Sequence, residues 1–159
     1  MTDSLALDYA QKLIACESVT PASGAVFDAL ETMLLPLGFT VERFIAGDGD
    51  DNPAHGAPVE NLLAIRQAPG RHFAFAGHVD VVPAGEGWSS DPFVPEIRGD
   101  LLHGRGAVDM KGSIAAFVAA LHQIPADAGT ISLIITGDEE GPAIYGTRAL
   151  IEHMQARGS

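Results

Sequence analysis

The sequence contains a single cysteine, Cys16, among its 159 residues, so no disulfide can form within the chain. A protein that folds without disulfides suits a reducing compartment, and we expect a cytoplasmic location. Cys16 falls on the apolar side of a predicted helix, and no electropositive residue flanks it. We therefore expect a buried structural thiol rather than a nucleophile.

Basic residues are also scarce. Nine Lys and Arg residues stand against 21 Asp and Glu residues, and the formal net charge is −12. This balance argues against nucleic acids and anionic membranes as partners, because both repel a strongly negative protein. No apolar run approaches the roughly 18 residues that a membrane-spanning helix needs, and the N-terminus lacks the basic segment of a signal peptide. The composition, 47% apolar and 19% charged, indicates a globular domain.

Hydrophobic periodicity predicts strands that alternate with helices. Apolar residues at helical spacing predict helices over residues 4–16, 23–35, 111–123 and 147–157. Short apolar or alternating runs predict strands over residues 39–45, 61–65, 72–76 and 130–136, with a hairpin over 96–103. This alternation indicates an α/β fold, in which functional sites form at the carboxyl ends of strands.

A histidine and an aspartate follow the strand at 72–76. Residues 77–83 read Gly-His-Val-Asp-Val-Val-Pro, which places His78 and Asp80 two positions apart. In extended backbone these two side chains project the same way. An imidazole beside a carboxylate can begin a metal site, although for this pair in isolation two polar residues that meet solvent are the favoured interpretation.

Two further motifs carry acidic residues. Residues 104–112 read Gly-Arg-Gly-Ala-Val-Asp-Met-Lys-Gly and place Asp109 at the start of a predicted helix, where an N-cap is the favoured interpretation of that residue alone. Residues 137–141 read Gly-Asp-Glu-Glu-Gly and place three acids directly after the strand at 130–136. Such charges raise one another's pKa unless cations or donors compensate. Glu139 and Glu140 therefore indicate either a solvated turn or a ligand cluster.

The three motifs together favour a metal centre. One imidazole and several carboxylates gathered at strand ends suit two zinc ions that share a bridging carboxylate. A carboxylate left free of metal could serve as a general base. The sequence has no Gly-x-Ser-x-Gly motif, so it does not indicate a serine nucleophile of that type.

The ordered motifs at 77–83, 104–112 and 138–141 resemble those of the zinc-dependent aminoacylase, carboxypeptidase and desuccinylase family. Residues 18–21 and 139–147 look most like its bacterial desuccinylases, and the resemblance covers essentially the whole chain. It implies a small-molecule amide hydrolase that releases succinate from N-succinyl-L,L-2,6-diaminopimelate, for lysine and cell-wall precursor synthesis. Another N-acyl amino acid, such as acetylornithine, is the alternative substrate.

The resemblance also implies a role for each motif residue. His78 would bind one zinc ion, Asp109 would bridge two ions, and Glu140 would bind the second. Glu139 would act as general base and acid, and Asp80 would orient His78. Cobalt could replace zinc at the same ligands.

The family sets the expected architecture: a three-layer α/β/α domain with a central, mostly parallel mixed sheet, truncated relative to the family. Residues 1–159 would form the N-terminal portion of the catalytic domain. The lid domain with its homodimer contact, and the C-terminal part of the catalytic domain with further ligands, would lie outside the chain. An inactive metal-binding fragment is therefore the alternative to an active hydrolase.

Two smaller expectations follow from the same resemblance. The peptide after the bridging aspartate is cis in the family, and here it is Asp109–Met110. Loss of the later chain would expose apolar surface around the strand at 130–136, so we expect either non-native self-association or a markedly lower stability than that of an intact domain.

Overall fold

The computed structural model describes residues 4–50, 52 and 55–157. The helices are α1 (Leu5–Ile14), α2 (Ala25–Leu34), α3 (Gly112–Leu121) and α4 (Thr147–Ala156), with helical turns η1 (Leu35–Leu37) and η3 (Ala107–Lys111). The strands are β1 (Thr40–Ala46), β2 (Val59–Arg66), β3 (His72–His78), β4 (Glu96–Arg98), β5 (Leu101–His103) and β6 (Thr130–Thr136). Every helix and strand predicted from periodicity is present.

Four of the strands form one sheet in the order β1–β2–β6–β3. The α/β class and the mixed sheet are confirmed, but the expectation of a mostly parallel sheet is wrong for the described residues. β2 pairs antiparallel with both β1 and β6, and only β3 and β6 are parallel. The connections explain this: β1 and β2 are joined by a loop that reverses the chain, whereas β3 reaches β6 through α3, a crossover long enough for parallel pairing.

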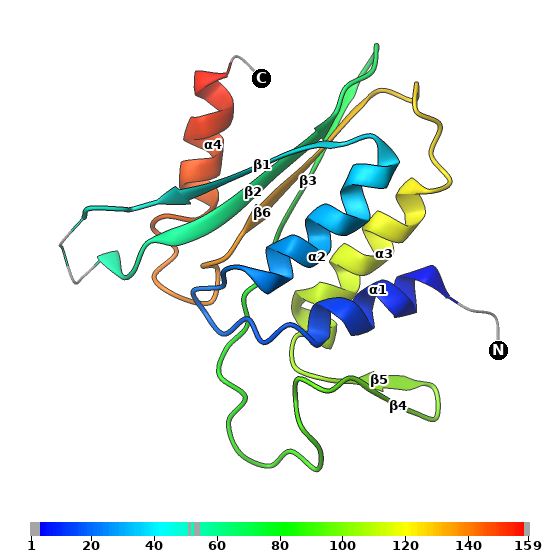
Figure 1. Cartoon of the computed structure of the whole chain (residues 1–159), viewed down its shortest axis with the longest axis vertical. Helices are drawn as coiled ribbons and strands as arrows, with labels where there is room; N and C mark the ends of the chain where they lie inside the picture. The colour runs from blue at the N-terminus through cyan, green and yellow to red at the C-terminus, as the bar shows by residue number, and fades with distance from the viewer. Residues whose placement is uncertain (1–3, 51, 53–54, 158–159) are drawn as a thin grey trace.

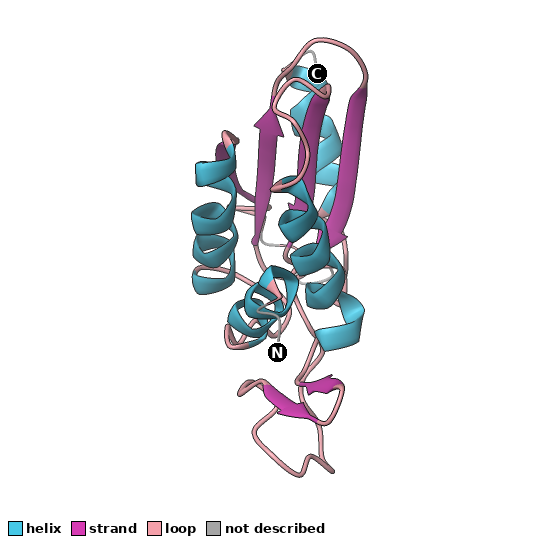
Figure 2. Ribbon diagram, turned by 90° about the vertical axis from the view of Figure 1, so that its right-hand side faces the viewer, coloured by secondary structure: helices cyan, strands magenta, loops and turns pink. Residues whose placement is uncertain are grey.

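Helices cover both faces of this sheet, as Figures 1 and 2 show: α1, α2 and α3 lie on one face and α4 lies on the other. β6 runs between β2 and β3 and is largely buried. The unpaired edges of the described sheet are β1 and β3. Among the described helices, none is long and apolar enough to cross a membrane.

The main core lies between the sheet and helices α1–α3. Leu13 of α1, Phe27 of α2, Val118 of α3 and Leu133 of β6 are fully buried in one cluster. Burying a large apolar side chain contributes about 1.5–3 kcal/mol. The strands that carry candidate ligands at their ends therefore belong to a well-packed core.

Parallel pairing brings the carboxyl ends of β3 and β6 side by side, with His78 opposite Thr136. Beyond β3 the chain stays extended because Val81 forms a parallel bridge with Val19: the Val81 backbone N–H donates to the Ser18 carbonyl, and the Val81 carbonyl accepts from the Thr20 N–H. The segment that carries Asp80 is therefore fixed by a part of the chain far away in sequence.

Candidate metal centre

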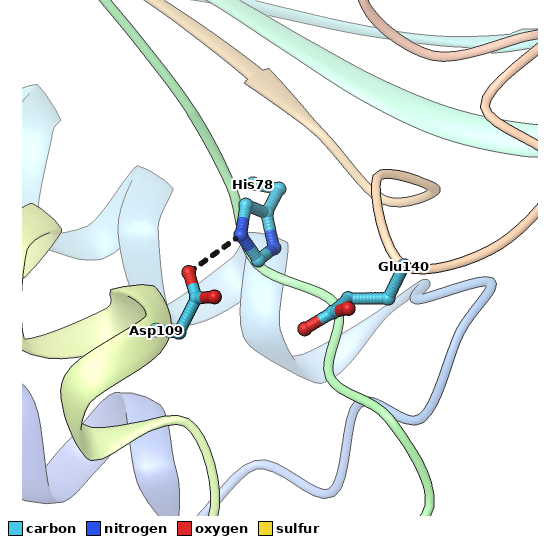
Figure 3. A group of neighbouring side chains, drawn as sticks. All are labelled: His78, Asp109 and Glu140. Carbon is cyan, nitrogen blue, oxygen red and sulfur yellow. Dashed lines mark hydrogen bonds and ion pairs between the residues drawn. The ribbon is translucent and has the colours of Figure 1, made fainter.

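His78, Asp109 and Glu140 converge from three separate elements (Figure 3). His78 ends β3 and is buried, Asp109 lies in η3 before α3, and Glu140 follows β6. One ligand atom from each residue lies within 4.8 Å of the others. An imidazole and two carboxylates are donors that bind divalent metal ions. The structure thus brings together the three residues that the sequence predicted as ligands.

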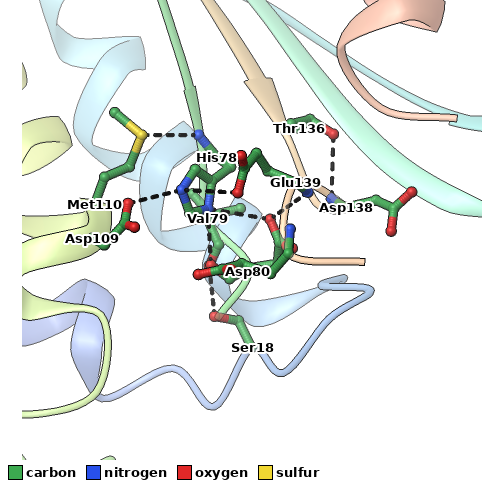
Figure 4. Close-up of polar contacts among 10 residues, drawn as sticks. Ser18, His78, Val79, Asp80, Asp109, Met110, Thr136, Asp138 and Glu139 are labelled. Atoms are coloured by element: carbon green, nitrogen blue, oxygen red, sulfur yellow. Dashed lines mark hydrogen bonds and ion pairs between the residues drawn. The ribbon is translucent and has the colours of Figure 1, made fainter. Parts of the chain in front are cut away.

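Both nitrogen atoms of the His78 ring face acceptors (Figure 4). Nδ1 lies 3.0 Å from the carbonyl oxygen of Asp80 and 3.4 Å from its carboxylate. Nε2 lies 3.1 Å from a carboxylate oxygen of Asp109. The Asp80 side chain above all, helped by Asp109, raises the pKa of His78 to about 9 although burial opposes the change. In the metal-free chain the ring therefore carries both protons, and a metal ion at Nε2 would replace one of them.

We expect the metal affinity of the chain to rise with pH. Below the His78 pKa of about 9, an ion must displace a proton, which lowers the affinity about tenfold per pH unit. Calorimetric zinc titrations between pH 6 and 8, in buffers of different ionisation enthalpy, should count about one released proton. An affinity independent of pH would contradict the doubly protonated ring.

The raised pKa of His78 also affects the stability of the chain without metal. It stabilises the fold below about pH 6.5, and this contribution is lost as pH rises through about 9.

Asp80 joins the ends of β3 and β6. It is fully buried, and its two carboxylate oxygens accept hydrogen bonds from the backbone N–H groups of Glu139 (3.1 Å) and Glu140 (2.9 Å). Burial raises the pKa of Asp80, but hydrogen bonds from His78 and from these two N–H groups outweigh it and lower the pKa. One ionised carboxylate thus holds the His78 ring and the start of the acidic loop together.

The N-cap interpretation of Asp109 is wrong. No side-chain hydrogen bond caps α3, and the Asp109 carboxylate faces His78 while 73% exposed. The Asp109–Met110 peptide is cis, as the resemblance implied. Met110 Sδ accepts a hydrogen bond from the backbone N–H of His78 at 3.4 Å. Gly77 leaves room for Met110, because a Cβ at Gly77 would lie 3.0 Å from the Met110 methyl group.

The two adjacent glutamates occupy different places. Glu140 belongs to the group of converging ligand atoms. Glu139 Oε2 lies 3.7 Å from His78 Nε2, and the Glu139 side chain is 57% exposed. Its carboxylate therefore stands beside the candidate ligands and remains open to water.

Two supports of the centre were missed from the sequence. The Ser18 hydroxyl donates to the Val79 carbonyl at 2.7 Å, and the buried Lys111 donates through Nζ to the Cys16 carbonyl at 2.8 Å. Burial lowers the pKa of Lys111 to about 8 and raises that of the Cys16 thiol, which disfavours a reactive thiolate. These contacts join residues 61 and 95 positions apart, so no local spacing indicates them.

A cleft of about 370 Å³ adjoins the centre, and its lining includes Val82, Arg105 and Val108 together with Asp109 and Glu140. Larger hollows of about 460 and 600 Å³ lie elsewhere, and within the described ranges no candidate ligand lines either of them. The smaller cleft is therefore the space in which a molecule could meet a metal ion.

A mixed sheet flanked by helices, with a histidine and carboxylates gathered at its strand ends, defines an α/β domain with a candidate metal site. The chain belongs to Peptidase family M20/M25/M40, whose family model matches residues 74–159. This family is metal-dependent.

Curated relatives match nearly the whole chain. The succinyl-diaminopimelate desuccinylase of Sphingopyxis alaskensis is 70% identical over 152 residues, which are 95% of this chain and 39% of the relative. The protein of that name from Erythrobacter litoralis is 64% identical over 157 residues, 98% of this chain and 41% of the relative. The crystal structure of human carnosine dipeptidase 1 has a TM-score of 0.74 at 25% identity, covering 96% of this chain and 35% of that one. The chain thus spans about two fifths of the length of these curated relatives.

Proposed function

We propose that the chain is the N-terminal portion of the catalytic domain of a zinc-dependent amide hydrolase. Its reaction would release succinate from N-succinyl-L,L-2,6-diaminopimelate. The observation that carries the chemistry is the convergence of His78, Asp109 and Glu140 within 4.8 Å. The substrate follows from relatives at 63–70% identity that are named succinyl-diaminopimelate desuccinylase.

The donor set suits zinc, because imidazole and carboxylates are its common ligands beside thiolates. His78 would hold one ion, Asp109 would bridge to a second, and Glu140 would hold that second ion. When bound, the ions supply Lewis acidity, which lowers the pKa of a water molecule and polarises the amide carbonyl. Cobalt accepts the same donors, and further ligands would come from the rest of a longer protein.

Glu139 would act as general base and general acid. Its exposed carboxylate, 3.7 Å from His78 Nε2, is close enough to take a proton from water at the centre and return it to the leaving nitrogen. Its backbone N–H donates to Asp80, which fixes where the side chain begins. Asp80 would also keep a proton on His78 Nδ1, which leaves Nε2 for the metal ion.

The substrate assignment is tested by assaying N-succinyl-diaminopimelate beside N-acetylornithine. Both the 159-residue chain and a protein extended to the length of its curated relatives are assayed with zinc, and zinc binding is titrated in parallel. We expect the longer protein to turn over the succinyl compound faster. Faster turnover of the acetyl compound would overturn the assignment, and zinc binding without turnover by the shorter chain would identify it as a metal-binding part of the enzyme.

We also propose that the isolated chain self-associates through β3. Among the described strands, β3 is an edge strand that pairs on one side only. Its Phe73 is 57% exposed, and the Phe73 ring stacks on the ring of Phe117. An unpaired strand edge beside exposed apolar surface favours association, although the net charge of −12 opposes it.

Light scattering across a dilution series should therefore show a mass that rises with concentration. A Phe73→Lys variant should shift the chain toward monomer. Leu101→Lys, at a similarly exposed position on the β4–β5 hairpin, serves as the control and should leave the mass unchanged. A monomer at every concentration, without binding of a dye for apolar surface, would contradict the proposal.

A further inference from the structure

The loop that carries the two glutamates, residues 138–146, is held at its far end by the β1–β2 loop. The Tyr145 hydroxyl donates to the Asp50 carboxylate and lies 3.3 Å from His55 Nδ1, which is itself 2.8 Å from the same carboxylate. Hydrogen bonding to the anionic Asp50 raises the pKa of Tyr145 to about 12. The contact therefore joins two segments that are 95 residues apart in sequence.

Two glycines bring the β1–β2 loop against this segment. A Cβ at Gly47 would lie 2.5 Å from the Tyr145 ring, and one at Gly56 would lie 2.9 Å from Pro142 Cγ. Both glycines also have positive φ angles, of +84° and +80°, which other residues rarely adopt. The backbone of the β1–β2 loop thus packs directly on residues 142–145, and larger side chains would push the two apart.

The loop of residues 138–146 can transmit this contact to the metal centre. The fully buried Asn61 donates through Nδ2 to the Tyr145 carbonyl at 2.8 Å. Burial raises the pKa of the Asp138 carboxylate, and the backbone N–H groups of Ala143 and Ile144 oppose this change. At the near end, Asp80 accepts from the N–H groups of both glutamates. The segment is therefore fixed at both ends and cross-linked in its middle.

Glu140 depends on this backbone more than the other candidate ligands do. Asp80 and Asp109 contact the His78 ring directly. Within the part of the chain that the structure describes, no hydrogen bond or ion pair orients the Glu140 carboxylate. Its place beside His78 and Asp109 is set by the course of the loop.

We propose that Tyr145 and Asp50 are positioning residues of the metal centre: their contact holds the loop in the course that places Glu140 within reach of the ion bound by His78 and Asp109. The inference deepens the proposed function, since it concerns the same centre. It assigns the β1–β2 loop to metal binding although none of its described side chains is among the converging ligands.

The experiment titrates zinc into the 159-residue chain by calorimetry and records the visible spectrum of the cobalt-loaded chain. The variants are Tyr145→Phe, which keeps the ring and removes the hydroxyl, and Asp50→Asn. The control is Tyr9→Phe. Tyr9 lies on α1, outside the centre, and its hydroxyl is 2.9 Å from His122 Nε2. Thermal melts of all variants report whether each one folds.

Both Tyr145→Phe and Asp50→Asn should weaken zinc binding about fivefold, less than the 10–100-fold expected for groups that touch a ligand directly. They should also change the cobalt spectrum, and the double variant should be no weaker than either single one, because they remove one contact. Tyr9→Phe should leave affinity and spectrum unchanged.

Several results would overturn the inference: unchanged metal affinity in folded Tyr145→Phe and Asp50→Asn, an equal loss in Tyr9→Phe, or no zinc binding by the unaltered chain. Failure of the proposed function looks different. In that case the metal effects would appear as expected while the longer protein failed to hydrolyse N-succinyl-diaminopimelate.

Discussion

A Glu139→Gln variant is expected to lose amide hydrolysis by a factor of about 10²–10⁴ while its zinc affinity stays nearly unchanged. Glutamine keeps the shape of the side chain but cannot accept the proton of water. The Glu139 backbone N–H still donates to Asp80, so the loop should keep its course. The measurement is substrate turnover by the protein extended to the length of its curated relatives, together with a calorimetric zinc titration of the same variant.

Glu140→Gln is the matched control, one residue further along. Its side chain belongs to the converging ligand group, so this substitution should weaken zinc binding first and activity as a consequence. Excess zinc should therefore restore activity in part to Glu140→Gln and not to Glu139→Gln. An equal loss of metal in both variants would contradict the separate roles of the two glutamates.

The second large effect is expected at Asp80. In Asp80→Asn, one carboxylate oxygen becomes an NH₂ group, which would face either the His78 ring or a backbone N–H that now lacks its acceptor. A buried donor left unpaired costs about 1–3 kcal/mol of stability. Because Asp80 also orients a candidate ligand, zinc affinity should fall about 10–100-fold. Thermal melts and zinc titrations measure the two effects.

The pH dependence separates this effect from a general loss of packing. The lowered pKa of Asp80 makes its ionised form stabilising above its ordinary value of 3.8, and this contribution is lost as the pH falls. The stability difference between the unaltered chain and Asp80→Asn should therefore be largest near neutral pH and shrink in acid. Asp100→Asn, at the exposed hairpin turn, should behave like the unaltered chain.

The secondary structure could be predicted because its signals are local. The apolar run of β6 and the helical spacing of α3 are each complete within about ten residues. The pairing of strands could not be predicted in the same way. β2 lies antiparallel to β6 although some 70 residues separate them, and neither sequence carries a signal for its partner.

The candidate ligands were predictable for a related reason. His78, Asp109 and Glu140 each stand in a short motif at the end of an element, and the carboxyl ends of strands are where α/β folds gather functional groups. The supports of the centre were not predictable. Ser18 reaches Val79 only because two distant segments meet in the folded chain.

By itself, the sequence determined which segments become strands and helices and which side chains can serve as metal donors, since both depend on residue type and short-range spacing. The tertiary structure alone decided that Asp109 faces His78 instead of capping α3, that Asp80 holds the loop of both glutamates, and that Tyr145 meets Asp50. These outcomes depend on distances between segments far apart in the chain, and only packing around a common core sets those distances.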